Sequence, residues 1–213
     1  MSPSGPLPPR PCGAWADGER SVSPPLDDAA TVAYWVADRL EEHGLAYAIG
    51  GALALAAHGV PRMTNDADLA VYLDGQPLEV LFAPLERAGC IFDRAAAKRD
   101  VERANLFTVK CGLILVDLFI SFHPLHDDAR SRRQALVGPD GRRRWFLSPE
   151  DLAVHKLALC RGKDRVDLER LFAARGPALD VAYIRHWIDR IIPEAEDPRR
   201  ATLDDLVRRF APR

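Results

Sequence analysis

The stretch that decides the fold reads PRMTNDADL and spans residues 61–69. Asp66 and Asp68 stand two positions apart at the start of a segment, Ala67 to Leu73, that has the pattern of a β-strand. Side chains two apart on a strand point to the same face, so the two carboxylates are expected side by side. Adjacent carboxylates repel each other, and a shared proton, a cation or a divalent metal ion relieves the repulsion. Such pairs also occur at solvated strand ends, so the motif alone does not identify a metal site.

A third carboxylate, Asp117, interrupts an apolar segment that reads LILVDLFI over residues 113–120. The segment from Leu113 to Ser121 is predicted to be a central strand covered on both faces. An unpaired ionised carboxylate buried there would cost several kcal/mol, so a compensating group is expected. If this strand lies beside the Asp66 and Asp68 strand, the three carboxylates form an oxygen-ligand site suited to Mg²⁺ or Mn²⁺. The alternative is a structural ion pair with Arg62 or Lys156.

Two glycines lie upstream in YAIGGALALAAHG, residues 47–59. A short strand, Ala46 to Ile49, is predicted to lead through Gly50 and Gly51 into a helix that ends near residues 58–59. Glycine at such a junction lets backbone N–H groups approach a phosphate at the start of the helix. Tight packing of the helix on the sheet explains the glycines equally well.

The remaining pattern predicts an α/β (α+β) fold, in which a small mixed sheet flanked by helices is followed by a helical subdomain. The α/β domain is expected over residues 26–147, the helical subdomain over residues 148–213, and a disordered Pro-rich tail over residues 1–25. Further predicted strands are Cys90–Asp93, Asn105–Val109 and about Arg144–Leu147, with a polar loop after Ser121. Predicted helices run from Asp27 or Asp28 to Gly44 and over residues 77–88, 150–159, 163–174, 180–192 and 202–210.

Composition excludes several classes of protein. The 213 residues include 29 basic and 31 acidic side chains, and a net charge of −2 argues against a polycation that binds nucleic acid by bulk charge. The four cysteines lie far apart without a C-x-x-C pair, so neither a zinc knuckle nor a disulfide framework is predicted. The chain shows no apolar run long enough for a membrane span and no signal-peptide core. A reducing cytoplasm is the expected setting.

A second group of charged residues occupies SPEDLAVHKLALCRGKDRVDL, residues 148–168. Lys156, Lys163, Asp164 and Asp167 surround a predicted helix-to-helix turn. A lysine there is suited to bind a phosphate, and a carboxylate to orient the lysine or activate a hydroxyl. The alternative is an exposed turn with charge pairs three residues apart.

Arginines form the strongest local excess of one charge. They indicate either a solvated hairpin or a patch that binds the phosphates of an RNA acceptor. These residues are Arg130, Arg132, Arg133, Arg142, Arg143 and Arg144. A zinc site at His123, His126 and Asp127 is disfavoured, because no further ligand follows at helical spacing.

With these motifs in order, residues 34–172 resemble the nucleotidyltransferase superfamily with the DNA polymerase β type fold, in its AbiEii and MenT-like bacterial branch. The first family motif matches the glycine segment, with Gly51-Ala52 favoured over Gly50-Gly51 in the binding position. The Arg-x-Ser/Thr-x-Asp-x-Asp motif matches Arg62, Thr64, Asp66 and Asp68, and the third acidic residue matches Asp117. The Arg-x-Arg/Lys-Asp-x-x-Asp motif matches Arg161, Lys163, Asp164 and Asp167. His155 departs from the family, which more often has glutamate before Lys156.

The resemblance implies transfer of a nucleoside monophosphate from an NTP to an acceptor hydroxyl, with pyrophosphate leaving. Asp66, Asp68 and Asp117 would bind Mg²⁺ or Mn²⁺, and these three with Lys156 would be catalytic. The implied nucleotide-binding residues are Gly50, Gly51, Ala52, Arg62, Thr64, Lys156, Lys163, Asp164 and Asp167. The acceptor would be the 3′ end of a tRNA, in a cytoplasmic toxin with a cognate antitoxin, or else an antibiotic or a protein. A catalytically silent nucleotide- or partner-binding member of the fold is the rival interpretation.

Overall fold

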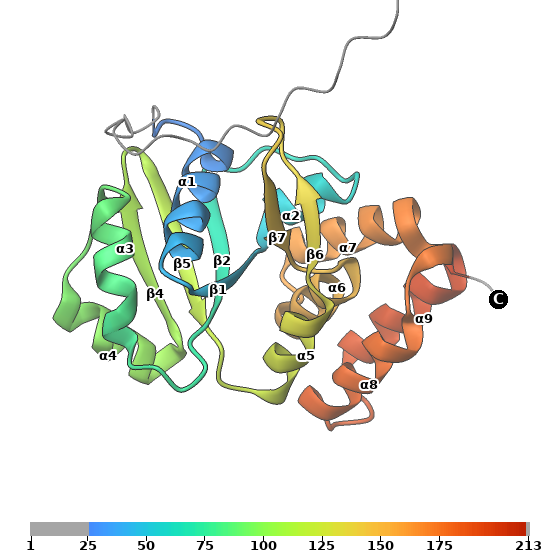
Figure 1. Ribbon diagram of the computed structural model, residues 1–213. Coiled ribbons are helices and arrows are strands. Elements are labelled where there is room, and N and C mark those ends of the chain that lie inside the picture. The colour runs from blue at the N-terminus through green and yellow to red at the C-terminus, as the bar shows by residue number, and fades with distance from the viewer. Residues whose placement is uncertain (1–25, 212–213) are drawn as a thin grey trace, which may run out of the picture.

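The computed structural model describes residues 26–211, and the expected Pro-rich tail lies outside this range. Seven strands form one mixed sheet in the order β3-β4-β5-β2-β1-β7-β6, with helices packed against it (Figure 1). The predicted α/β class is therefore confirmed. The strands are β1 (Ala46–Ile49), β2 (Asp66–Tyr72), β3 (Cys90–Ile91), β4 (Leu106–Cys111), β5 (Ile114–Ile120), β6 (Gln134–Val137) and β7 (Arg143–Phe146).

Three helices cover one face of the sheet, which we call the closed face. They are α1 (Ala29–Glu42), α3 (Phe82–Arg87) and α4 (Arg94–Ala104), and they lie in front of the strands in Figure 1. Helix α1 begins where Asp28 accepts a hydrogen bond of 2.9 Å from the Thr31 amide, as the sequence predicts. Leu69, Val116 and Leu118 point into the core between these helices and the sheet and are fully buried. The closed face thus holds much of the hydrophobic core.

The remaining helices gather beside β1, β7 and β6. Helix α6 packs against α2, α7, α8 and α9, so it lies at the centre of this group. Its start is fixed by Ser148, whose hydroxyl accepts from the Asp151 amide at 3.1 Å, and by Pro149 in the first turn. The helices are α2 (Gly51–Ala57), α5 (Pro124–Arg132), α6 (Pro149–Leu159), α7 (Gly162–Arg175), α8 (Val181–Ile191) and α9 (Pro198–Phe210). The predicted division at residue 147 stays a prediction.

Several segments differ from the sequence-based prediction. The predicted polar loop after Ser121 contains helix α5, because the His123 side chain caps its start and Pro124 suits a first helical position. Helix α4 and strand β6 lack a strong periodic apolar pattern and escaped prediction. The predicted helix over residues 77–88 begins as a 3-10 turn, Leu78–Leu81, before α3, and a second such turn covers Gly176–Ala178.

Strand β5 is buried on one face only, so the prediction that both faces are covered is wrong. Leu115 and Phe119 remain 51% and 41% exposed on the face that carries Asp117. Asp117 is half-buried and accepts a hydrogen bond of 2.6 Å from the Thr108 hydroxyl. The expected cost of an unpaired buried carboxylate does not arise, because the face of β5 that carries Asp117 is accessible to solvent and Thr108 donates a hydrogen bond to that carboxylate.

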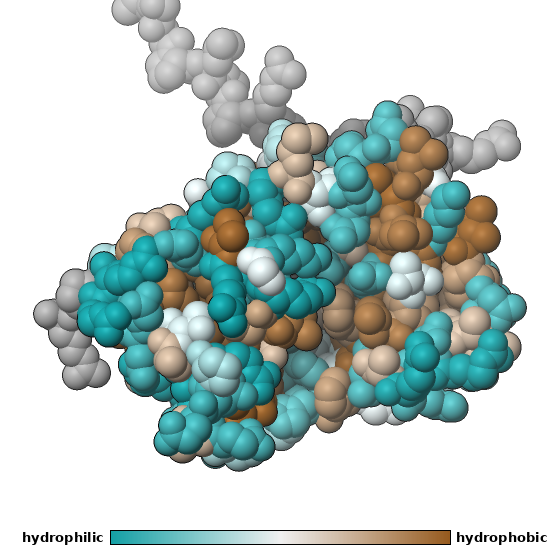
Figure 2. Space-filling model, turned by 180° about the vertical axis from the view of Figure 1, so that it is seen from behind, coloured by the Kyte–Doolittle hydropathy of each residue, from teal (hydrophilic) through white to brown (hydrophobic). Residues whose placement is uncertain are grey.

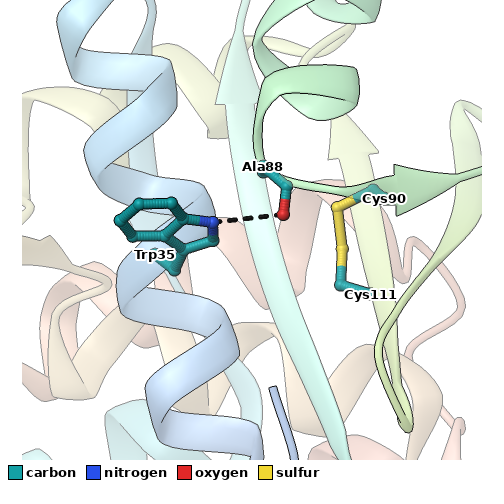
Figure 3. The surroundings of a disulfide bond; sticks show 4 residues. All are labelled: Trp35, Ala88, Cys90 and Cys111. Atoms are coloured by element: carbon teal, nitrogen blue, oxygen red, sulfur yellow. Dashed lines mark hydrogen bonds between the residues drawn. A yellow bond between two sulfur atoms is a disulfide. The ribbon is translucent and has the colours of Figure 1, made fainter. Parts of the chain in front are cut away.

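A disulfide joins Cys90 and Cys111, contrary to the prediction of none (Figure 3). The two residues lie 21 positions apart in sequence, but the antiparallel register of β3 and β4 sets them directly opposite each other, with their Cα atoms 4.3 Å apart. Trp35 of α1 donates a hydrogen bond to the Ala88 carbonyl next to this bridge. The disulfide depends on the pairing of β3 with β4, which the spacing of the cysteines in the sequence does not reveal. Within residues 26–211 no helix is long and apolar enough to cross a membrane.

Candidate active site

Three carboxylates share the face of the sheet opposite α1, which we call the open face. Asp68 of β2 is the direct register partner of Asp117 in the parallel neighbour β5, and Asp66 precedes Asp68 by two residues on the same face. The Thr64 hydroxyl donates to the Asp66 carboxylate, and Thr108 donates to Asp117. The pairing of β2 with β5 thus meets the condition that the sequence argument set, and it places Asp66, Asp68 and Asp117 on one face of neighbouring strands.

Electrostatics at Asp68 indicate an excess of negative charge. Burial, followed by repulsion from Asp66 and Asp117, raises the pKa of Asp68 to about 6, although Lys156 and Lys163 act in the opposite direction. A cation among the carboxylates would relieve this repulsion.

The donor atoms of the three carboxylates suit a divalent metal ion. All the donor atoms are oxygens, the type that Mg²⁺ and Mn²⁺ prefer, and the charge of the cluster matches a divalent cation. As the side chains lie, no group of three or more His, Cys, Asp or Glu residues within positions 26–211 is gathered closely enough to enclose an ion. The residues therefore fit the ion in the type and charge of their donor atoms, and binding requires the side chains to move from these positions.

Gly51 has to be glycine for two reasons. Its φ of +54° is a left-handed conformation, and an added Cβ atom would lie 1.8 Å from the Asp68 Oδ2 atom. The preceding Gly50 donates a backbone hydrogen bond of 2.8 Å to the Asp68 carbonyl, which ties the turn to β2. The buried Ala52 follows in α2. The backbone at Gly51 therefore approaches the Asp68 carboxylate more closely than any residue with a side chain could.

A buried group of charges lies where α6 meets α7. Lys156 donates a hydrogen bond of 2.6 Å to Asp167, whose other oxygen is 3.1 Å from the Arg62 Nε atom. Asp164 lies 3.7 Å from the Lys156 amine and accepts from the backbone and side chain of Arg161. Asp167 thus joins Arg62, from the segment before β2, to Lys156.

The predicted role of Asp164 or Asp167 in orienting Lys163 finds no support in these contacts. Lys163 is exposed, and the two aspartates instead pair with Lys156, Arg62 and Arg161. The physical reason is helical geometry, because the side chain next to Asp164 in sequence points away from it by about 100°. Lys163 still lies near enough to Asp68 to lower its pKa.

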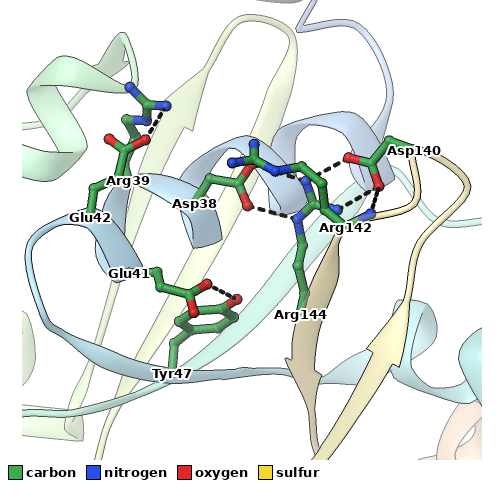
Figure 4. Close-up of polar contacts among 8 residues, drawn as sticks. All are labelled: Asp38, Arg39, Glu41, Glu42, Tyr47, Asp140, Arg142 and Arg144. Carbon is green, nitrogen blue, oxygen red and sulfur yellow. Dashed lines mark hydrogen bonds and ion pairs between the residues drawn. The ribbon is translucent and has the colours of Figure 1, made fainter. Parts of the chain in front are cut away.

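The six arginines do not form one free phosphate-binding patch. Arg144 is only 2% exposed and forms ion pairs with Asp38 of α1 and with Asp140, and Arg142 pairs with Asp38 as well (Figure 4). By its register in β7, Arg144 lies on the closed face, away from the three carboxylates. The other paired members are Arg130 with Asp74, Arg132 with Glu150 and Asp180, and Arg133 with the Tyr47 carbonyl. Acidic neighbours distant in sequence neutralise most of this positive charge.

His155, the departure from the family motif, packs on a second histidine. Its ring stacks on that of His126 in α5, with ring centroids 5.9 Å apart. Burial, then the neighbouring His126 and Lys156, lowers the pKa of His155 to about 4. His155 is therefore neutral at pH 7 and acts as part of the packing between α5 and α6.

Sequence reasoning missed Thr108, a residue of the site. Thr108 holds Asp117, and the hairpin centred on Gly112 sets the two opposite each other. This pairing can be found by counting outward from the Cys111-Gly112 turn once β4 and β5 are known. Arg161 belongs to the matched motif, and its pairing with Asp164, which raises the pKa of Arg161, is a charge pair three residues apart of the kind that the sequence left open as the alternative.

Comparison with known proteins identifies the fold. No family model and no curated protein matches this sequence. The solution structure of the antibiotic-resistance factor ANT(2'')-Ia is similar, with a TM-score of 0.52 and 16% identity over 84% of this chain and 96% of that chain. A crystal structure of ANT(2")-Ia with adenylyl-2"-tobramycin gives a TM-score of 0.47, at 16% identity over 85% of this chain and 98% of that one. An antigenic nucleotidyltransferase-like protein from Paracoccidioides brasiliensis gives 0.39, at 16% identity, over 86% of this chain and 89% of that one. The first similarity confirms the expected nucleotidyltransferase fold, and the AbiEii and MenT-like branch stays a prediction.

Proposed function

We propose that this protein is a Mg²⁺-dependent nucleotidyltransferase, which transfers a nucleoside monophosphate from an NTP to an acceptor hydroxyl. The observation that carries the proposal is the pairing of Asp68 with Asp117 on the open face. The turn at Gly51, which has no side chain, lies next to this pair. Packing of α2 on β2 accounts for the close approach of the Gly51 backbone to Asp68, but it does not account for the repulsion between the carboxylates. Both features suit a site for a metal-bound triphosphate.

Asp66, Asp68 and Asp117 would hold the metal ion. The ion supplies neutralisation of triphosphate charge and polarisation of the α-phosphate. Gly51 lets the start of α2 lie against the Asp68 carboxylate, and Lys156 and Arg62 add positive charge at positions that Asp167 fixes. Asp117, which is half-exposed beside Leu115 and Phe119, is placed to accept the proton of the acceptor hydroxyl.

Labelling with each of the four α-³²P-NTPs, Mg²⁺ and candidate acceptors tests this function, together with release of pyrophosphate. We expect activity in the wild type and a loss of about 100-fold or more in Asp68→Asn and Asp117→Asn. Glu102→Gln is the matched control, because Glu102 is an exposed carboxylate of α4 on the other side of the sheet. A wild type that binds NTP but never releases pyrophosphate would instead favour the catalytically silent binding protein.

The narrower expectation is transfer to a tRNA 3′ end by a toxin with a cognate antitoxin. It rests on the motif match and on the six arginines. Because Arg144 is buried in ion pairs and its neighbours are largely paired, the arginines no longer argue for RNA. Addition of label to the 3′ end of tRNA in the same assay would establish this acceptor.

A further inference from the structure

Apolar side chains flank Asp117 along β5 on the open face. The strand register places Leu115 and Phe119 two residues before and after Asp117, so all three point the same way. Ile91 of β3 and Leu106 of β4 extend this surface onto the neighbouring strands. Leu106 lies opposite Phe119, and Ile91 lies opposite Lys110, which is opposite Leu115. We call Ile91, Leu106, Leu113, Leu115 and Phe119 the apolar strip. The candidate catalytic carboxylate therefore lies between two exposed apolar side chains of its own strand, with Thr108 and Asp68 beside it on the neighbouring strands.

The apolar strip is exposed. Leu113, Leu115 and Phe119 are 77%, 51% and 41% exposed, and Ile91 on the edge strand is 75% exposed. Figure 2, seen from behind, shows hydrophobic residues gathered on the side opposite the C-terminal helices, which is the side of β4 and β5. From Leu113 to Phe119 the strip runs about 20 Å, at roughly 3.3 Å per residue. Exposed apolar surface of this extent typically marks a binding face.

The charges along the strip do not suit a polyanion. Asp66, Asp68 and Asp117 line one side of it, and Lys110 is the one cation in the two rows that contain Leu115 and Asp117 among the described residues. An RNA backbone needs several cations along its path. Arg144 of the arginine-rich segment does not supply one, because it points to the closed face and is paired there with Asp38.

We propose that the acceptor hydroxyl belongs to a serine, threonine or tyrosine in an extended polypeptide that lies along the apolar strip. This inference rests on the proposed nucleotidyltransferase function. An extended chain places alternate side chains on one face with the same spacing as β5 itself. A hydroxyl residue over Asp117 then has its neighbours at −2 and +2 over Leu115 and Phe119. The predicted recognition pattern is an apolar residue, any residue, the hydroxyl residue, any residue and an apolar residue.

The transfer step balances without a further reactant. The side-chain oxygen attacks the α-phosphorus of the NTP, and the bond from that phosphorus to the bridging oxygen of pyrophosphate breaks. A phosphodiester forms between the side chain and the nucleoside monophosphate. The hydroxyl proton passes to the Asp117 carboxylate, which lies on the strip itself. Pyrophosphate takes the bond electrons as it leaves.

Two synthetic peptides of identical composition test this proposal. One contains Val-Lys-Thr-Lys-Val, with valines at −2 and +2, and the other contains Lys-Val-Thr-Val-Lys, with valines at −1 and +1. Serine and tyrosine versions of both, and an RNA oligonucleotide ending in CCA, complete the acceptor set. We expect the first arrangement to be labelled about 100-fold faster at equal concentration, since the second arrangement loses two buried apolar contacts and each costs about one decade.

Variants of the strip give the second readout. Leu115→Gln and Phe119→Gln should each lower peptide labelling about tenfold. Both should leave unchanged the rate of pyrophosphate release in the absence of peptide, when water is the acceptor. Val137→Gln is the matched control, because Val137 is 62% exposed on β6, at the other edge of the sheet. Size-exclusion chromatography of all variants checks whether the strip holds two copies of the chain together.

Three results would overturn the proposal. These are equal labelling of the two peptide arrangements, labelling confined to the RNA and insensitive to Leu115→Gln and Phe119→Gln, or a wild-type dimer that these substitutions dissociate. Failure of the underlying function looks different, because the wild type would then release no pyrophosphate from any NTP, with or without an acceptor.

Discussion

Asp68 and Asp117 lie directly opposite each other on the parallel strands β2 and β5, and the backbone of Gly51 lies against the Asp68 carboxylate. Burial, and then repulsion from Asp66 and Asp117, raises the pKa of Asp68, so the ionised carboxylate costs stability in this row of the sheet. A fold selected for stability alone would separate them or pair each with a cation. The relationship therefore favours a site whose charge is balanced by something that binds.

The first prediction concerns the stability cost of Asp68. Its pKa is raised to about 6 from an ordinary value of 3.8, so the ionised carboxylate destabilises the fold above pH 6. As the pH falls from 6 to 4, the native protein takes up a proton before the unfolded chain does, and the cost disappears. Asp68→Asn should therefore be more stable than the wild type at pH 8 in EDTA, by up to about 3 kcal/mol, and equal to it near pH 4.

Urea denaturation at the two pH values measures this difference. Mg²⁺ at pH 8 should stabilise the wild type and leave Asp68→Asn unchanged. An advantage of the variant that is the same at pH 4 and pH 8 would show that the repulsion at Asp68 is not its cause.

The second prediction separates backbone strain from steric conflict at Gly51. Gly51→Ala adds a Cβ atom that collides with Asp68 in a left-handed backbone conformation, so it should abolish NTP binding and destabilise the protein by more than about 2 kcal/mol. Gly44 has a similar φ of +69° with nothing within 4 Å of the added atom, so Gly44→Ala should cost only about 1 kcal/mol. Thermal unfolding and NTP titration compare the two variants. Equal losses in both would mean that strain, not contact with Asp68, explains Gly51.

The third prediction concerns the disulfide. Closing a loop of 21 residues between Cys90 and Cys111 should stabilise the protein by about 3 kcal/mol in the chain-entropy account. Reduction with dithiothreitol should lower the unfolding temperature accordingly. Cys160→Ser should leave the temperature unchanged, because Cys160 is a free thiol. Titration of free thiols before and after reduction verifies the pairing, and a double variant, Cys90→Ser with Cys111→Ser, should match the reduced protein.

Several parts of the fold could be predicted because their determinants are local. Asp66 and Asp68 belong to one strand, the Gly51 turn follows a short apolar run, and Asp28 marks a helix start. The parallel pairing of β2 with β5, which sets Asp117 opposite Asp68, was a condition in the sequence argument and is a finding of the structure.

Other features depended on contacts between distant residues and could not be read from the sequence. The sequence gives no sign that Arg144 is paired, because its partner Asp38 lies more than a hundred positions away. Whether both faces of β5 are buried depends on which helices pack over them. An apolar residue such as Phe119 does not itself indicate that it stays exposed. The pairing of Cys90 with Cys111 follows from the register of β3 on β4.

A fourth prediction tests Asp167 as the residue that positions two cations. Removing its charge would leave the buried Lys156 amine without its partner at 2.6 Å and release Arg62. Asp167→Asn should destabilise the protein by about 3 kcal/mol, as expected for one broken partner of a buried ion pair, and should raise the KM for NTP more than it lowers kcat. Asp167→Glu should restore part of both. A drop in kcat alone, with KM unchanged, would assign Asp167 a different role.

The last prediction follows from the histidine stack between α5 and α6. His155 is packed against His126 and lies next to Lys156, so burial and these neighbours hold its pKa at about 4, and the pKa of His126 is also lowered. Both rings are neutral in the folded protein at pH 7. In the unfolded chain histidine has its ordinary pKa near 6.5, so the unfolded state takes up protons first as the pH falls. The contribution of the neutral stack is therefore present above pH 6.5 and is lost progressively between pH 6.5 and pH 4.

Unfolding temperatures measured over this range should fall more steeply in the wild type than in His155→Phe, which keeps an aromatic ring on His126 and has no charge to gain. His186→Gln is the control, because His186 is exposed on α8. Its profile should follow that of the wild type. Identical profiles for the wild type and His155→Phe would mean that other groups cause the acid sensitivity, and that the stack does not link pH to the packing of α6, the helix that carries Lys156.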